Sequence, residues 1–363
     1  MTAFGKHSDL IVRSDDPFNG GPPPGLLRRH FITPTNLFFV RNHAPVPSVD
    51  PTTYRLIVDG LVRAPLQLSL DDLRARFSRV TVAATVVCAG NRRRELMALK
   101  PVPGEVPWDT EAISTAEWGG TPLRAVLDAA GVQPTSRHVA FIGLDQVEKN
   151  GERFGFGGSI PIEKAMSPEV LLADTMNGEP LPPTHGFPLR VLVPGFVGAR
   201  SVKWLGGITL QAEPSQNYYR AHSYRLFPPE VTDATADWEQ GQVIDDLSVN
   251  AAITEPLPGA AVPAGALTVR GYAIAGSGHA VARVEVSPDG EASWTPATLS
   301  GDASPWTWRF WEAQVQLAAG SHELVARAFD AAGAVQPPDP RSIWNFKGYM
   351  NNAWHRVPVT VRA

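Results

Sequence analysis

The segment Thr85-Val-Val-Cys-Ala-Gly-Asn-Arg-Arg-Arg94 carries the strongest signal in this 363-residue chain, because it holds the only cysteine. Its apolar, β-branched start predicts a strand that ends at the thiol of Cys88, followed by a small-residue turn and three arginines. Nearby positive charge stabilises a thiolate, which is a nucleophile and a ligand for soft metals. A single cysteine is also commonly a small buried hydrophobe, so the segment by itself leaves both interpretations open.

Further motifs on both sides of this segment favour the metal ligand. In chain order they are Leu37-Phe-Phe-Val-Arg-Asn-His43, Ala112-Ile-Ser-Thr115, Met176-Asn-Gly-Glu-Pro-Leu-Pro182, His185-Gly-Phe-Pro-Leu-Arg190, Val197-Gly-Ala-Arg-Ser-Val-Lys-Trp-Leu205, Ala252-Ile-Thr-Glu-Pro256, Trp344-Asn-Phe-Lys-Gly348 and Ala353-Trp-His-Arg356. Each is a weak signal alone. In this order and spacing, over most of the chain, the sequence resembles the sulfite oxidase family.

The resemblance implies a molybdenum–molybdopterin cofactor, with the thiolate of Cys88 as the protein ligand to the metal. The residues that it implies for binding the pterin are Phe39, Val40, Arg41, Asn42, His43, Asp145, His185, Arg190, Ser201, Val202 and Lys203. The catalytic residues that it implies around a small oxyanion are Arg41, Arg93, Trp108, Tyr224 and Lys347. Arginine suits an oxyanion because its planar, permanently charged fork donates two hydrogen bonds to one edge. Of the three adjacent arginines we assign only Arg93, since side chains on one helical turn cannot all face one site.

Two positions depart from the family pattern. Many sulfite oxidases have arginine where this chain has Lys347, and an aspartate is common where it has Ser223. Lysine keeps the positive charge but cannot form the bidentate hydrogen bond of arginine. We therefore expect the affinity for anions, or the selectivity among them, to differ from that of family members with arginine. The segment Gly348-Tyr-Met-Asn-Asn352 also resembles the assimilatory nitrate reductases, a sister group. The resemblance therefore specifies the cofactor better than the substrate.

The composition is that of a globular protein, with 43% hydrophobic and 19% charged residues and a formal net charge of −4. This charge gives no overall field to attract nucleic acid or an anionic membrane, so we expect neither as a partner. The first 16 residues hold no apolar stretch with a small-residue cleavage site. We therefore expect a cytoplasmic protein, or a periplasmic one if a leader has been removed.

The length favours two domains. Residues 1–246 predict an α+β molybdopterin-binding domain, in which residues 1–30 are mobile or extended and include a Gly/Pro-rich linker at 20–25. Within it, we expect a helix capped by Ser69 and another that ends at Gly131. Residues 247–363 hold short strands separated by turns, which predicts an all-β, immunoglobulin-like sandwich. The resemblance implies that this domain forms a homodimer, and we expect it to dock firmly on the first.

The leading hypothesis for function is the oxidation of sulfite to sulfate by oxo transfer, with electrons passed singly to an external acceptor. The alternative within the family is a reductase of nitrate or another small oxidised molecule. A different class, a non-catalytic binding module with a degenerate pocket, is disfavoured because the chain keeps Cys88, Arg41, Arg93 and Tyr224.

Overall fold

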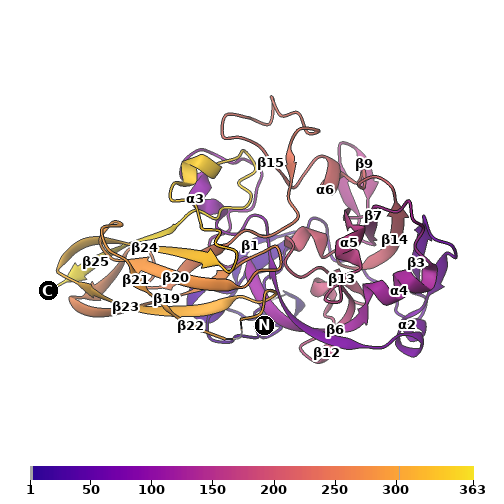
Figure 1. The fold of residues 1–363 in the computed structure, drawn as a ribbon, viewed down its shortest axis with the longest axis horizontal. Coiled ribbons are helices and arrows are strands. Elements are labelled where there is room, and N and C mark those ends of the chain that lie inside the picture. The colour runs from indigo at the N-terminus through magenta and orange to yellow at the C-terminus, as the bar shows by residue number, and fades with distance from the viewer. Residues whose placement is uncertain (1–2, 302) are drawn as a thin grey trace.

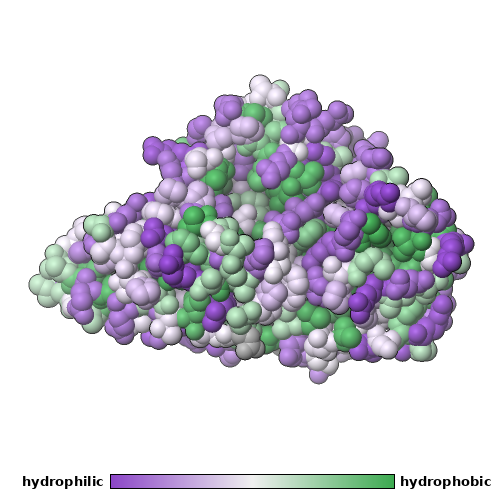
Figure 2. Space-filling model, in the orientation of Figure 1, coloured by the Kyte–Doolittle hydropathy of each residue, from purple (hydrophilic) through white to green (hydrophobic). Residues whose placement is uncertain are grey.

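The computed structural model describes residues 3–301 and 303–363. Mixed sheets with short helices make up the first part of the chain, and an elongated sandwich of strands makes up the last third (Figure 1). This arrangement confirms an α+β domain followed by an all-β domain. On the face shown in Figure 2, apolar side chains lie in small groups between hydrophilic ones. Among the described residues, no helix combines the length and the hydropathy needed to cross a bilayer.

A five-stranded sheet lies at the centre of the first part, and one of its pairs, β14 with β3, is parallel. In spatial order the strands are β10 (Gly157–Pro161), β7 (His138–Gly143), β14 (Leu205–Gln211), β3 (Leu56–Gly60) and β4 (Leu66–Leu68). This part of the chain also contains the helices α2 (Leu70–Arg76), α4 (Leu123–Ala130) and α5 (Ile162–Ala165). The predicted cap of α2 is confirmed, because Ser69 Oγ accepts from the Asp72 N–H and the Asp72 carboxylate accepts from the Ser69 N–H. Gly131 ends α4 at φ 74°, as predicted.

A second sheet carries the cysteine segment. Its order is β12 (Glu179–Pro180), β11 (Leu171–Met176), β6 (Ile113–Pro122) and β5 (Val80–Val87), and β13 (Arg190–Leu192) also pairs with β11. Asn177 and Gly178, both with positive φ, form the turn between β11 and β12, as an Asn-Gly pair commonly does. Strand β5 pairs with β6 along its whole length, and the last pair joins Val87 to Ile113. Cys88 therefore follows directly after the end of a rigid strand.

The N-terminal segment differs from the expectation of a mobile or extended chain. It forms η1 (Ala3–Gly5), the hairpin β1 (Ile11–Asp15) with β2 (Phe18–Gly21), and α1 (Pro24–Leu27), which begins inside the expected linker. Phe18 and Leu10 are buried in a cluster with Leu37 and Val40. The Gly/Pro content at 20–25 indicated a linker, but apolar contacts made by its neighbours hold the segment against the domain.

The remaining elements of the first part are short. They are the pairs β8 (Val147–Lys149) with β9 (Glu152–Phe154) and β15 (Arg225–Leu226) with β16 (Gln242–Val243), the helices α3 (Arg93–Met97) and α6 (Tyr218–Ala221), and the 3-10 turns η2 (Pro183–His185) and η3 (Gly198–Arg200). Helix α3 begins five residues after Cys88. It fixes the three arginines relative to the thiol.

Two antiparallel-rich sheets form the sandwich. One has the order β17 (Asn250–Glu255), β19 (Gly265–Ile274), β23 (Arg309–Leu317) and β22 (Thr298–Ser300). The other has the order β18 (Ala260–Pro263), β25 (His355–Arg362), β24 (Gly320–Asp330), β20 (Val281–Ser287) and β21 (Thr295–Pro296), and η4 (Pro340–Ile343) lies before β25. Alternate residues such as Val284, Trp311 and Val357 are buried between the sheets. The short strands separated by turns that the sequence predicts are present.

The sandwich docks on the cysteine-bearing sheet through a shared apolar core. Tyr272 and Trp308 of the sandwich are buried in the same cluster as the central sheet of the first part. The Thr85 N–H donates to the Trp306 carbonyl at 2.8 Å, and the Trp308 N–H donates to Thr85 Oγ1 at 2.8 Å. The strand that leads to Cys88 is thus held by both parts of the chain, which agrees with the expected firm docking.

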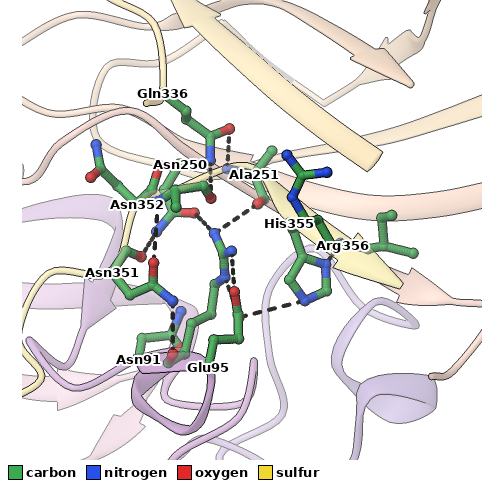
Figure 3. A network of polar contacts seen from close by, with 12 residues as sticks. Asn91, Glu95, Asn250, Ala251, Gln336, Asn351, Asn352, His355 and Arg356 are labelled. Atoms are coloured by element: carbon green, nitrogen blue, oxygen red, sulfur yellow. Dashed lines mark hydrogen bonds and ion pairs between the residues drawn. The ribbon is translucent and has the colours of Figure 1, made fainter. Parts of the chain in front are cut away.

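A buried polar network also crosses this junction (Figure 3). Arg92 is fully buried, and its guanidinium donates to both carboxylate oxygens of Glu95, at 2.8 and 2.7 Å, and to Asn250 Oδ1 at 2.6 Å. Asn351 Nδ2 donates to the Arg92 carbonyl at 2.9 Å. His355 Nε2 lies 3.6 Å from Glu95, and burial lowers the pKa of this imidazole to about 4. Charge-assisted hydrogen bonds therefore attach the sandwich to the start of α3.

Candidate active site

Cys88 lies at a turn whose backbone donates a hydrogen bond to its sulfur. Its N–H donates to the Ala112 carbonyl at 2.9 Å, which continues the β5–β6 pairing by one residue. The Gly90 N–H donates to Cys88 Sγ at 3.4 Å, and such a donor stabilises negative charge on sulfur. A Cβ at Gly90 would lie 2.5 Å from the Arg93 guanidinium, so only glycine lets that cation approach the turn. Cys88 is partly exposed, as reactive cysteines commonly are.

A cavity opens beside Cys88 and holds about 680 Å³ of unfilled space, its open mouth included. The lining brings together, from distant parts of the sequence, every residue expected to bind the pterin or the metal: Phe39, Val40, Arg41, Asn42, His43, Cys88, Asp145, His185, Arg190, Ser201, Val202 and Lys203. Tyr224 of the expected catalytic set also lines it, whereas Arg93, Trp108 and Lys347 do not.

Positive charge dominates the wall of this cavity. Arg41, Arg190 and Lys203 lie there with one lining carboxylate among the described residues, that of Asp145. Burial lowers the pKa of Arg190 to about 9; burial and the charge of Arg190 lower the pKa of Lys203 well below its usual value. Burial also raises the pKa of Asp145. Crowding cations in a dry pocket costs free energy, which a bound anion offsets.

The cavity fits the phosphate and the metal of molybdopterin. Arg190 Nε is a buried donor with no hydrogen-bond partner among the described residues, although Nη1 and Nη2 donate to the carbonyls of His185 and Ser201. A buried donor left unpaired costs about 1–3 kcal/mol, so a phosphate oxygen at this point is stabilising. A thiol on the same wall supplies a soft ligand. The donor set therefore suits an anionic cofactor with a thiophilic metal.

An aromatic stack carries the tyrosine of the site. Tyr224 adopts φ 52°, and its hydroxyl is 3.0 Å from His43 Nε2. Its ring stacks on Tyr349 with centroids 5.2 Å apart and planes 7° apart. Burial raises the pKa of the Tyr224 phenol well above its usual value. The phenol therefore stays protonated and able to donate a hydrogen bond into the cavity.

The three adjacent arginines face three directions, because Arg93 and Arg94 are successive residues of α3 and Arg92 precedes the helix with a left-handed backbone at φ 63°. Arg92 enters the sandwich network, and Arg94 is exposed and pairs with Asp109 at 2.9 Å. Arg93 is 2% exposed and passes between Gly90 and Gly348, where a Cβ on either glycine would collide with it. It donates to the carbonyls of residues 347 and 106, and it lies 5.3 Å from the centre of the Tyr349 ring. Arg93 thus reaches the aromatic stack from behind the cysteine turn.

Trp108 and Lys347 both lie outside the cavity lining. Trp108 is fully buried edge-on to Phe39, and its Nε1 has no hydrogen-bond partner among the described residues. Lys347 Nζ lies 3.8 Å from a carboxylate oxygen of Glu105 and 3.8 Å from one of Asp233. Of the residues expected around the oxyanion, Arg41 and Tyr224 line the cavity, whereas Arg93, Trp108 and Lys347 lie outside its lining.

Several residues of the site were missed by the sequence analysis. Phe38, Ala89, Phe156, Gly198 and Trp204 also line the cavity. Phe38, Ala89, Gly198 and Trp204 lie within motifs of the sequence analysis that assigned them no role, so assigning the whole motifs to the cavity would have found them, whereas Phe156 lies outside those motifs. Lys6 had no such signal: it comes from the N-terminal segment, contacts His185 Nε2 and donates to the Phe38 carbonyl at 2.9 Å. Only the packing of that segment brings it to the cavity wall.

Comparisons with known proteins cover nearly the whole chain. Family models described as the oxidoreductase molybdopterin binding domain and the Mo-co oxidoreductase dimerisation domain match residues 43–219 and 241–362. The chain is 48% identical to the sulfite oxidase of Gallus gallus, with 97% of this chain and 78% of that protein covered. It is 47% identical to the mitochondrial sulfite oxidase of Homo sapiens, with 98% of this chain and 66% of that protein covered.

Two further relatives extend the comparison. The chain is 39% identical to the nitrate reductase [NAD(P)H] of Hordeum vulgare, over 99% of this chain and 43% of that protein. The solved structure of the sulfane dehydrogenase SoxCD from Paracoccus pantotrophus matches with a TM-score of 0.81 and 27% identity, covering 97% of this chain and 89% of that one. The cysteine turn and the cation-rich cavity suit a molybdopterin cofactor, and the similarities point to the same cofactor. The chain belongs to the sulfite oxidase family of molybdopterin-dependent oxidoreductases.

Proposed function

We propose that this protein oxidises sulfite to sulfate and passes the two electrons to an external acceptor. The observation that carries the proposal is the position of the Cys88 thiol on the wall of a cation-rich cavity, with Arg41 and Tyr224 beside it. The overall reaction takes up one water and releases two protons and two electrons. The 45–48% identity to vertebrate sulfite oxidases, against 39% to the nitrate reductase of Hordeum vulgare, supports sulfite over nitrate.

The residues that line the cavity would hold the cofactor. When bound, the molybdenum centre supplies a two-electron redox couple and an exchangeable oxygen. Cys88 would ligate the metal, while Arg190 and Lys203, with the Ser201 hydroxyl, would bind the phosphate of the pterin. Asn42 and His43 would fix the edge of the ring system. These side chains neutralise and orient the cofactor without taking part in the redox step.

The substrate anion would lie between the cysteine turn and the Tyr224 stack. Arg41 would bind and orient its oxygens from the cavity wall, and Arg93, Lys347 and the unpaired Trp108 Nε1 would complete the set from the other side of the turn. Tyr224, protonated and already bonded to His43, would donate a hydrogen bond to an oxygen of the anion. Holding several donors in fixed positions is what lets a site favour the charge distribution of the reacting anion.

We expect the purified protein to contain about one molybdenum per chain and to oxidise sulfite with an artificial one-electron acceptor. The test is elemental analysis together with steady-state rates measured separately with sulfite and with nitrate plus a reductant. Reduction of nitrate at a higher kcat/KM than oxidation of sulfite would overturn the choice of substrate. Absence of molybdenum from active protein would overturn the cofactor role of the cavity.

We also propose that residues 247–363 form an immunoglobulin-type sandwich that holds a homodimer. The match of the Mo-co oxidoreductase dimerisation domain to residues 241–362 supports this. Closed twofold symmetry is the commonest arrangement of soluble oligomers. We expect light scattering coupled to size exclusion to give twice the chain mass at micromolar concentration. A mass of one chain under these conditions would contradict the dimer. The cytoplasmic location stays a prediction.

A further inference from the structure

The two cations behind the cysteine turn, Arg93 and Lys347, already share a carboxylate. Glu105 Oε2 lies 3.4 Å from Arg93 Nη2, and Glu105 Oε1 lies 3.8 Å from Lys347 Nζ. The Glu105 side chain is only 16% exposed. One oxygen therefore faces each cation, which is the arrangement that an oxyanion bridging the two cations would adopt.

The surroundings of Glu105 place its charge next to the aromatic stack. Burial raises the pKa of Tyr349, and the charge of Glu105 is the next contribution to that rise. Tyr349 in turn stacks on Tyr224, which lines the cavity. Asp233, the other carboxylate close to Lys347, has a side chain that is 76% exposed and makes no ion pair with Arg93. Glu105 is thus the carboxylate that lies on the inner side of the cation pair.

The backbone around Glu105 is restrained, while its side chain is held loosely. Residues 101, 103 and 107 are prolines, and the Val106 carbonyl accepts from Arg93 Nη1 at 2.9 Å. Both ion-pair distances, 3.4 and 3.8 Å, exceed the roughly 2.7–2.9 Å of a good charge-assisted hydrogen bond. Displacing the carboxylate therefore breaks no strong hydrogen bond and needs only rotation about side-chain bonds.

We propose that Glu105 is a resident anion that occupies the oxyanion position of the empty site and swings away when the substrate binds. This inference rests on the proposed function, because it takes Arg93 and Lys347 as cations that face the substrate. A carboxylate that neutralises them in the empty site lowers the apparent affinity for sulfite and for the product alike. Its return over the cations also favours release of sulfate. Glu105 thereby sets the range of sulfite concentration over which the rate responds to the substrate.

The test is the binding of sulfate, an unreactive dianion, to the holoenzyme by isothermal titration calorimetry at low ionic strength. Glu105→Gln keeps the shape of the side chain and removes the charge, so we expect the Kd for sulfate to fall by about three- to tenfold, as for loss of a partly exposed charge pair. The KM for sulfite should fall by a similar factor, with a smaller change in kcat. Glu105→Ala should behave in the same way.

Asp233→Asn is the matched control, because it removes a charge near Lys347 that is exposed and does not reach Arg93. We expect it to change the Kd for sulfate by less than about twofold. An unchanged or higher Kd in Glu105→Gln and Glu105→Ala would overturn the proposal, as would an equal gain in Asp233→Asn. Sulfate binding does not depend on turnover. Tighter sulfate binding in a protein that fails to oxidise sulfite would therefore refute the proposed function while supporting the role of Glu105.

Discussion

Replacing Cys88 with serine is expected to abolish turnover while leaving the pterin bound. The pterin would be held by residues spread over the whole cavity wall, from Phe39 to Lys203, and these do not depend on the thiol. A serine hydroxyl is a harder and poorer ligand for a thiophilic metal. We expect the rate of sulfite oxidation to fall by at least about 100-fold, since changes to groups that only orient metal ligands already cost about 10–100-fold.

Two measurements separate loss of the ligand from loss of the cofactor. The pterin is quantified by the fluorescence of its oxidised form and the metal by mass spectrometry, each per mole of chain, in the wild type and in Cys88→Ser. Equal pterin content with a lost rate is the expected result. Activity of Cys88→Ser at the wild-type level would contradict the assignment of Cys88 as the metal ligand.

Removing the guanidinium of Arg92 is expected to destabilise the junction between the two domains. Arg92 is fully buried and makes the bidentate contact with Glu95, so Arg92→Met leaves the Glu95 carboxylate next to His355 without its main partner. Breaking one side of a fully buried ion pair costs about 3–5 kcal/mol of unfolding free energy, and because the Glu95 side chain is 32% exposed we expect about 2–3 kcal/mol here. We expect Arg92→Met to unfold at a lower urea concentration than the wild type. The measurement is urea denaturation monitored by tryptophan fluorescence.

The chain offers two matched controls for this change. Arg94→Met removes the neighbouring arginine, whose exposed pair with Asp109 is worth less than about 1 kcal/mol. Arg92→Met with Glu95→Gln removes both charges, and we expect it to recover part of the loss because no uncompensated carboxylate remains buried. If Arg92→Met were no more destabilising than Arg94→Met, the network in Figure 3 would contribute little to the docking.

The local structure of this chain follows closely from local sequence. The reciprocal cap at Ser69, the left-handed end of α4 at Gly131 and the turn at Asn177-Gly178 each depend on a few adjacent residues, and each is present. The N-terminal segment did not follow its sequence signal. Its Gly/Pro content indicates a flexible linker, but the burial of Phe18 and Lys6 depends on partners distant in the sequence.

The sequence by itself predicted that Cys88 ligates a metal and identified the motifs that accompany it, because the order and spacing of short motifs are properties of the chain alone. It also predicted that only one of the three adjacent arginines faces the site. The three side chains do diverge, but only Arg93 and Arg94 lie on α3, whereas Arg92 precedes it with a left-handed backbone. The family, the α+β domain and the all-β domain followed from the same features.

Only the tertiary structure decided how these residues meet. Arg93, Trp108 and Lys347 lie outside the cavity lining, and Lys347 comes to the cysteine turn only because the sandwich docks there. Glu105 gave no signal in the sequence, where a glutamate in a proline-rich loop is an ordinary surface residue. Arg93 is close to Glu105 in the sequence, but the contact of Glu105 with Lys347 joins segments more than 200 residues apart. Such contacts are set by the packing of the two domains, which no local pattern encodes.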